Sequence, residues 1–492
     1  MLHTVIIGAG PAGLAAGYEM SGKGARVAVL ERMNQVGGLS RTVAHNGCRF
    51  DIGPHRFFTK NEEVNQLFLD IVAEDTIHVS RLTRIFHNDK FFDYPLTPLN
   101  ALFGVGASVA IFSSYLLAQL WEKIAPQEPE NFEQWVTSRF GAQLFQAFFK
   151  TYTEKVWGIP CAKIGAGWAG QRIKGLSLGT AVWNAVGKTL GLANGKTVKT
   201  LVDEFMFPRL GAGQFYEKMA ALIEARGSSI LIGRQVKTIL REGLRVRSVI
   251  VTDEFGNEES VEAEHFMSSA PLTEVIEMMD PAPPDEVLKA CRSLFYRDHI
   301  GVHLKLAGET FPDNWIYVHS ERVRMARVVN HRSFSPDMAD RAGISPLTVE
   351  YFTFKGDVVW NLSDAELVGL AVRELGQMNI AKATQLLSAF VVRSEKAYPV
   401  IETGFQRHIE TIKTWLDRFE NLTPIGRSGM FKYNNQDHAI YTGLLAARTT
   451  LGLGRYDPWL VNNDAEYHES APPNRENRIR RICAEVEDAA GQ

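Results

Sequence analysis

The chain begins with a glycine-rich turn between an apolar run and a helix-forming stretch. Residues 5–7 (Val-Ile-Ile) lead into Gly-Ala-Gly-Pro-Ala-Gly, and residues 14–20 favour a helix. Gly8 permits a tight turn, Gly10 lets a pyrophosphate approach the backbone, and Gly13 lets the helix pack on the strand. A second apolar run ends at Glu31, roughly 20 residues further on, where a carboxylate can hold ribose hydroxyls. This order predicts a dinucleotide site with its phosphates at a helix N-terminus.

A second pair of glycines follows Glu31 and points to FAD rather than NAD. The stretch from Arg32 to Thr42 contains four further residues expected at the cofactor: Arg32, Gly38, Leu39 and Ser40. The glycines bring more backbone to the cofactor, and Arg41 can neutralise its pyrophosphate. NAD domains usually continue into another βα unit instead. The Gly-Gly-x-x-Arg pattern resembles the flavoprotein superfamily of amine oxidases, protoporphyrinogen oxidases and UDP-galactopyranose mutases, which implies FAD.

The composition is that of an ordinary globular protein. Of 492 residues, 45% are hydrophobic and 22% are charged, and the formal net charge is -3. No basic cluster is interleaved with aromatic residues, so we expect no nucleic-acid partner. The four cysteines are scattered without metal-ligand spacing, which predicts reduced thiols, no metal site and a cytoplasmic location. We expect no signal peptide, because the dinucleotide motif begins almost at Met1.

An uncharged segment, residues 100–121, is long enough to span a bilayer. It also contains glycines, serines and a glutamine, and it lies within a chain whose flanking parts are typical of a soluble protein. Two interpretations stay open: a buried or interfacial helix of a substrate domain, or peripheral membrane contact.

The succession of patterns predicts an α/β protein with a discontinuous Rossmann-type FAD-binding domain, a helical insertion and a mixed-sheet substrate domain. The expected ranges are 1–90, 205–285 and 415–455 for the FAD-binding domain, 91–204 for the helical insertion, 286–414 for the substrate domain, and 456–492 for a C-terminal tail. Within residues 205–285, we expect the Val236 side chain to contact the adenine of FAD.

Three further constellations suggest a site. His55 stands in a glycine-proline loop (residues 51–59) that follows the FAD-binding part. Tyr152 and Trp157 are five residues apart at a helix end and could form an aromatic slot for a flat base. A glycine turn before a helix is expected to place donors at the flavin; its residues of interest are Gly426, Arg427, Asn435, Gln436 and Asp437. An ordinary structural role remains the alternative for each of the three.

Together these motifs resemble the UDP-galactopyranose mutase family over most of the chain, from residue 4 to about 452. The resemblance implies that Tyr152 and Trp157 hold the uracil and that His55 faces the flavin near the sugar. It places Arg172 and Arg327 in the active site, where Arg327 binds the diphosphate of the nucleotide sugar. It further implies two substrate-binding tyrosines, Tyr398 and Tyr433.

Two departures from the family pattern put UDP-galactose itself in doubt. Phe58 stands where family members often carry a second histidine, and Phe431 stands where they carry a diphosphate-binding tyrosine.

The resemblance implies a mutase that interconverts pyranose and furanose forms of a nucleotide sugar. In that mechanism N5 of reduced FAD attacks the anomeric carbon and forms a flavin–sugar adduct, with no net redox change. The alternative is an FAD-dependent oxidoreductase of the amine oxidase or protoporphyrinogen oxidase type, acting on a small or lipophilic substrate. The uncharged segment 100–121 suits a lipophilic substrate, whereas the Tyr152–Trp157 motif suits the mutase.

Overall fold

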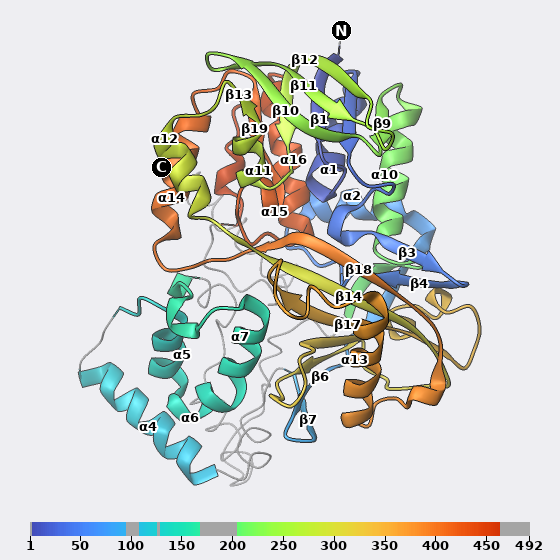
Figure 1. Ribbon diagram of the computed structural model, residues 1–492, viewed down its shortest axis with the longest axis vertical. Coiled ribbons are helices and arrows are strands. Elements are labelled where there is room, and N and C mark those ends of the chain that lie inside the picture. Colours follow the sequence, from blue (N-terminus) through green and yellow to red (C-terminus); the bar gives the residue numbers. More distant parts are fainter. Residues whose placement is uncertain (1, 95–107, 125–127, 168–203, 463–492) are drawn as a thin grey trace, which may run out of the picture.

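The computed structural model describes residues 2–94, 108–124, 128–167 and 204–462. Two large sheets dominate this part of the chain, one above the other in Figure 1. The upper sheet carries the N-terminal glycine turn. The lower sheet is flanked by a group of helices, drawn at the lower left. This arrangement confirms the predicted α/β class with a second, mixed sheet.

The upper sheet has the strand order β13-β10-β11-β12-β1-β2-β9, and β19 pairs with β12. Its strands are β1 (Leu2–Ile7), β2 (Val27–Glu31), β9 (Ser229–Ile232), β10 (Gln235–Glu242), β11 (Arg245–Thr252), β12 (Glu258–Ser268), β13 (Met279–Asp280) and β19 (Leu422–Pro424). β1 runs parallel to both β12 and β2. Buried parallel strands are typically continuous apolar runs, as residues 27–30 are.

The helix after the glycine turn, α1 (Pro11–Gly22), is held close to the sheet by its small residues. A Cβ at Gly13 would lie 1.9 Å from the carbonyl oxygen of Gly8. α1 packs between α10 (Gly213–Ala225) and α16 (Gln436–Thr450), so segments far apart in sequence share one core. The glycine turn is therefore fixed from several sides before any ligand binds.

The lower sheet has the order β18-β14-β17-β16-β15-β6-β7 and is antiparallel except where β15 meets β6. Its strands are β6 (Thr83–His87), β7 (Lys90–Asp93), β14 (Tyr296–Ala307), β15 (Trp315–Val318), β16 (Arg327–Asn330), β17 (Ile344–Thr353) and β18 (Leu386–Pro399). α13 (Asp364–Gln377) packs on this sheet. Most of β6–β7 falls in the range 1–90 expected for the FAD-binding domain, yet the pairing of β6 with β15 places the hairpin in the lower sheet. Strand pairing of this kind is not visible in local sequence.

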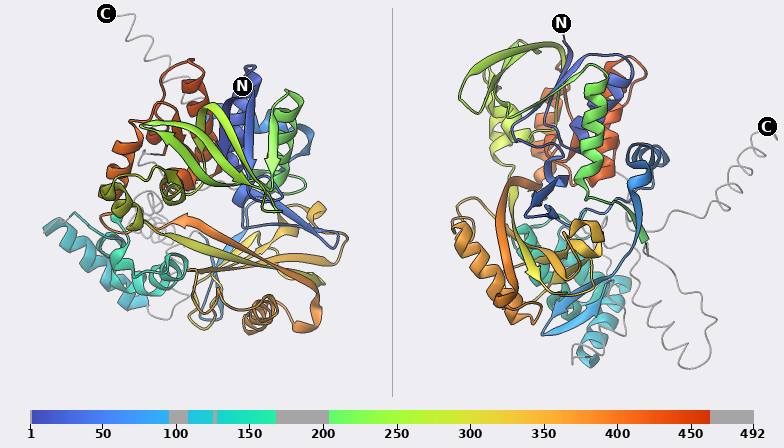
Figure 2. Two further views of the ribbon diagram at one scale, coloured as in Figure 1. Left: turned by 45° about the horizontal axis from the view of Figure 1, so that its top comes forward. Right: turned by 90° about the vertical axis from the view of Figure 1, so that its right-hand side faces the viewer.

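One long strand, β18, connects the two halves (Figure 2). Its pairing with β14 shifts register between Arg297 and His299, so that Ser394 pairs with His299 and Tyr398 with Arg297. Asp298 accepts hydrogen bonds there from the backbone N–H groups of Lys396 (2.7 Å) and Lys355 (2.7 Å). Lys396 has φ +53°, as in a β-bulge that re-aims a side chain.

The helical group consists of α4 (Ser108–Ile124), α5 (Phe132–Phe140), α6 (Ala142–Leu144), a π-helix (Phe145–Lys150) and α7 (Thr151–Trp157). The second part of the uncharged segment 100–121 lies in α4, and residues 100–107 lie outside the described residues. α4 buries Ile111 and leaves an apolar stripe at least half exposed: Leu116, Leu117, Leu120, Trp121 and Ile124. In the described residues, no helix is long and apolar enough to cross a membrane.

The other elements complete the two halves. They are β3 (Thr42–His45), β4 (Cys48–Asp51), α2 (Glu62–Val72), β5 (Thr76–Ser80), β8 (Glu204–Pro208), α11 (Leu272–Glu277), α12 (Asp285–Arg292), α14 (Phe405–Leu416) and α15 (Gly426–Gly429), with short 3-10 turns between them. β3 pairs with β4, and β5 pairs with β8.

Candidate functional site

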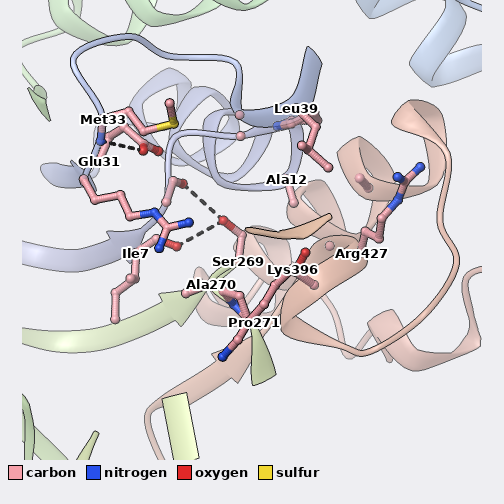
Figure 3. Close-up of a pocket in the computed structure, with 18 of the residues that line it drawn as sticks. Ile7, Ala12, Glu31, Met33, Leu39, Ser269, Ala270, Pro271, Lys396 and Arg427 are labelled. Carbon is pink, nitrogen blue, oxygen red and sulfur yellow. Dashed lines mark hydrogen bonds between the residues drawn. The ribbon is translucent and has the colours of Figure 1, made fainter. Parts of the chain in front are cut away.

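A cavity of about 670 Å³ opens at the carboxyl ends of β1, β2 and β12. Twelve of the residues expected at the cofactor line it: Gly8, Gly10, Glu31, Arg32, Gly38, Leu39, Ser40, Val236, Gly426, Arg427, Asn435 and Gln436. In Figure 3, Glu31 and Arg427 lie on opposite sides of the view, with Ser269 between them. The cavity is therefore elongated, and its lining comes from the N-terminal, middle and C-terminal parts of the chain.

Glu31 organises one end of the cavity. Its carboxylate accepts hydrogen bonds from the backbone N–H groups of Ala9 (2.8 Å) and Met33 (3.0 Å), and the side chain is buried. The carboxylate thus ties the glycine turn to the loop after β2. Val236 also lines the cavity, two residues after Arg234, whose backbone N–H donates to the carbonyl of Glu31 (2.8 Å).

The middle of the cavity is lined by backbone. Gly38 has φ +56°, and a Cβ there would meet the Cα of Gly10 at 3.1 Å. The Ser269 hydroxyl donates to the carbonyl of Ile7 (3.1 Å) and holds the end of β1. The buried Arg41 donates to the carbonyl of Gly38 (2.7 Å), and burial lowers the pKa of its guanidinium. Arg41 lines the cavity and brings a positive charge beside the backbone donors.

The other end is formed by His55 and Asn434. Among the described residues, the Nδ1 atom of His55 and the Nδ2 atom of Asn434 are buried without a hydrogen-bond partner. Burial, followed by the charge of Arg427, lowers the pKa of His55 to about 3, so the imidazole is neutral at neutral pH. A neutral ring and an unpaired amide in a cavity wall are positioned to bond a ligand.

Beside this end, Arg427 lies over two tyrosine rings. Its guanidinium carbon is 5.0 Å from the ring centre of Tyr398 and 5.2 Å from that of Tyr433. The two rings stack 5.8 Å apart, and Trp157 lies 5.5 Å from Tyr433. Trp157 is 1% exposed. Three predicted substrate residues and one predicted cofactor residue therefore form a single cation–aromatic cluster.

Arg327 lies on β16 and is paired with a buried carboxylate that no sequence motif indicated. Its Nε is 2.5 Å from Oε2 of Glu350, and its Nη2 donates to Oε1 at 3.0 Å. The Nε2 atom of His299 is 2.9 Å from the same Oε1. Burial raises the pKa of Glu350, but Arg327 and His299 outweigh it and lower the pKa to about 2. The hydroxyl of Tyr398 is 3.5 Å from Arg327 Nη2, which links the pair to the aromatic cluster.

Tyr152 and Trp157 contact different neighbours. The Tyr152 ring stacks on His319 at 4.7 Å and lies edge-on to Tyr317 at 5.3 Å, whereas Trp157 contacts Tyr433. The predicted two-walled slot is therefore not formed by these two rings alone. Between them, Lys155 donates to three backbone carbonyls, those of Val318, Ser320 and Met325, and fixes α7 to the lower sheet.

The remaining predicted positions lie elsewhere. Gly13 packs α1 on the glycine turn and does not line the cavity. Asp437 lies in the first turn of α16, 3.4 Å from Nδ1 of His438, and is also outside the lining. Phe431 is buried against Tyr296, with ring centres 4.9 Å apart, so its side chain faces the core. Arg172 lies outside the described residues.

Sequence reasoning missed Glu350, His299 and the cavity residues of β18. Glu350 is the one charged residue of β17, whose ten residues are all buried. A buried charge almost always has a partner, so this pattern was a usable signal. Lys396 lines the cavity next to Ala270 and Pro271 and pairs with Glu274 at 2.9 Å (Figure 3). No local pattern predicts a bulge that turns a lysine toward the cavity.

The residues of the cavity fit an FAD molecule. Its volume suits a large ligand. Gly10 and Gly38 lie so close together that no side chain fits between them, which leaves backbone N–H groups to bind a pyrophosphate. Arg41 supplies a positive charge to balance the negative charge of the pyrophosphate. At the far end, His55 and Asn434 offer buried polar atoms with no protein partner in the described part of the chain.

Comparison with known proteins gives the class to which the fold and the cavity belong. The model of the family described as flavin containing amine oxidoreductase matches residues 11–406, and the chain belongs to this family. It is therefore an FAD-dependent enzyme of the amine oxidase superfamily.

Two curated relatives are enzymes of different kinds. The chain is 28% identical to a probable UDP-galactopyranose mutase of Klebsiella pneumoniae over 169 residues, which are 33% of this chain and 43% of the relative. It is 42% identical to a 4,4'-diapophytoene desaturase of Methylomonas sp. over 93 residues, 18% of each chain. The chain thus matches less than half of the length of these relatives.

The fold extends the similarity to almost the whole chain. A crystal structure of reduced UDP-galactopyranose mutase superimposes with a TM-score of 0.81 at 21% identity, covering 94% of this chain and 96% of that one. At this identity the likeness concerns the fold.

Proposed function

We propose that this flavoenzyme interconverts the pyranose and furanose forms of a nucleotide sugar. The observation that carries the proposal is the cation–aromatic cluster beside the His55 end of the cavity. Arg427 lies over Tyr398 and Tyr433, and Arg327 lies next to Tyr398. Guanidinium groups bind phosphate oxygens, and aromatic rings bind a planar base. A nucleoside diphosphate needs both kinds of contact.

In this mechanism the protein binds and orients the substrate. Arg427 and Arg327 bind the diphosphate, while Tyr398 and Tyr433 donate hydroxyl hydrogens to it. Trp157 and Tyr152 contact the base from α7. The Glu350–Arg327 pair keeps the guanidinium fixed, so that little ordering is needed when the diphosphate binds.

His55 is expected to hydrogen-bond a sugar hydroxyl in its neutral form, because its pKa is lowered to about 3. Reduced FAD in the cavity would supply a nucleophilic nitrogen at the anomeric carbon, with no net redox change.

The test is to incubate the purified protein anaerobically with UDP-galactofuranose, with and without dithionite, and to follow the pyranose by chromatography. We expect conversion only with reduced flavin. Trp157→Phe and Arg327→Lys should each weaken UDP binding about tenfold, which corresponds to about 1.4 kcal/mol. Trp459→Phe, which alters a tryptophan on the 3-10 turn Pro458–Leu460, is the matched control. Unchanged UDP affinity in both site variants would contradict the proposal.

The second candidate is an FAD-dependent oxidoreductase acting on a lipophilic substrate. It is favoured by the exposed apolar stripe of α4, which also suits peripheral membrane contact. Under this alternative the flavin is bleached by a lipophilic donor in the absence of dithionite, and UDP does not bind. The two candidates therefore give opposite results in the same two assays.

A further inference from the structure

Two histidines and a glutamate meet on the upper sheet, away from the cavity. His3 lies at the start of β1, and Glu264 and His265 lie on the adjacent strand β12. The two strands are parallel, with Thr4 aligned to His265. The cavity opens beyond Ile7 at the other end of β1, about 13 Å from His3 along the strand. In Figure 1 the N-terminus marks the outer end of this sheet.

The three side chains are arranged as metal ligands are. Each offers one ligand atom, and these atoms all lie within 4.8 Å of one another. The two imidazole rings are stacked, with centres 5.3 Å apart and planes inclined by 28°. Because both histidines are on paired strands, their spacing is set by the sheet and not by a mobile loop.

A second contact orients His3. Its Nδ1 atom is 3.0 Å from the hydroxyl of Thr4, which is fully buried. A histidine that binds a metal through one nitrogen usually has the other nitrogen in such a hydrogen bond. This contact leaves Nε2 of His3 for a ligand. Within the described part of the chain, neither the Glu264 carboxylate nor the His265 ring has a hydrogen-bonded side-chain partner.

We propose that His3, Glu264 and His265 bind one divalent transition-metal ion of the Zn²⁺ type. Two imidazoles and one carboxylate suit Zn²⁺, Co²⁺ or Ni²⁺, whereas Mg²⁺ and Ca²⁺ require mostly oxygen ligands. Three protein ligands leave the fourth position to water. The ion would join β1 to β12 at the end of the sheet away from the cavity, and it would stabilise the folded state because only the folded chain brings these residues together.

From the sequence we expected no metal site, because the four cysteines are scattered. Cysteine spacing could not indicate the site proposed here, since the three ligands come from segments that only the parallel pairing of β1 and β12 brings together.

The experiment uses the tag-free holoprotein after chelator treatment. We expect calorimetric titration with Zn²⁺ to give one ion per chain with a micromolar Kd, and Co²⁺ to give absorption bands above 550 nm, clear of the flavin. His3→Gln and His265→Gln should each weaken binding at least tenfold, and Glu264→Gln several-fold. Zn²⁺ should raise the unfolding temperature of the parent but not of His265→Gln.

His78→Gln, which alters an exposed histidine on β5, is the matched control and should bind Zn²⁺ like the parent. The flavin-to-protein absorbance ratio and the metal-free unfolding temperature show that each variant is folded. Absence of binding in the parent, or equal Zn²⁺ affinity in the parent and the His3→Gln/His265→Gln double variant, would overturn the proposal.

Discussion

Two buried carboxyl groups, Asp51 and Glu350, have widely different pKa values. Asp51, at the end of β4, accepts hydrogen bonds from the hydroxyl of Thr42 (2.5 Å) and the N–H of Ala212 (3.1 Å). Glu350, in the lower sheet, is bound by Arg327 and His299. Burial raises the pKa of Asp51 to about 7, while the pKa of Glu350 is held at about 2 against the effect of burial.

The difference shows that burial alone does not decide whether a carboxyl group is charged. Both side chains are 1% exposed. Asp51 is surrounded by neutral groups, namely the hydroxyl of Thr42 and the backbone of the glycine turn Gly211–Gly213. Thr42 follows Arg41, which lines the cavity, and this region is built mainly from backbone. Glu350 belongs to a region built from charged side chains. The two regions should therefore respond differently to mutation and to pH.

The largest expected effect is in the lower sheet. Glu350→Gln leaves the Arg327 guanidinium without its counter-charge in a buried site, and we expect the free energy of unfolding to fall by about 3–5 kcal/mol. Urea denaturation of the holoprotein measures this change in the free energy of unfolding. Glu395→Gln, which breaks the exposed pair with Lys355, is the control and should cost less than about 1 kcal/mol. A double variant that also replaces Arg327 with methionine should recover part of the loss. If Glu350→Gln and Glu395→Gln lowered the free energy of unfolding equally, the lower sheet would not depend on its buried charges as proposed.

The second prediction concerns pH at Asp51. A folded-state pKa of about 7 lies above the usual value of 3.8, so between these values the folded state binds the extra proton. The contribution of Asp51 to the free energy of unfolding is therefore present at low pH and is lost as pH rises toward 7. From pH 5 to pH 7, Asp51→Asn should gain about 2 kcal/mol relative to the parent.

The relative measurement is needed because buried histidines act in the opposite direction. Burial lowers the pKa of His319 and of His331 to about 3, so their contributions to stability grow as pH rises from about 3 to about 6.5. Denaturation of parent and variant at both pH values cancels these shared contributions. A difference that does not change with pH would show that Asp51 is ionised throughout.

The smallest of the three effects is at the glycine turn. A Cβ in Gly13→Ala would meet the Gly8 carbonyl at 1.9 Å and displace the turn, so we expect FAD to bind about tenfold more weakly. Gly167→Ala, at a position with no atom within 4 Å, should retain FAD fully. The flavin-to-protein absorbance ratio after dialysis is the measurement. Glu350→Gln should retain FAD as well. FAD retention would then distinguish the glycine turn from the lower sheet, in addition to stability.

The cofactor side could be predicted from sequence because its signals are local. A strand, a glycine turn and an acid within one short stretch define how backbone meets phosphate, and Gly8, Gly10 and Glu31 line the cavity as expected. The lower sheet offered no such stretch. Glu350, Arg327 and His299 lie on three different strands, and only strand pairing brings them together. The pairing of β6 with β15 is likewise not visible in local sequence.

The long strand β18 constrains how this chain can change over evolutionary time. Lys396, at the cavity, and Tyr398, in the cation–aromatic cluster, are separated by one residue of a single strand. An insertion or deletion near the bulge would shift both sites together, whereas surface loops elsewhere accept changes of length. Descendants of this chain can therefore acquire a new substrate by substitution along β18, but length variation is confined to the loops around it.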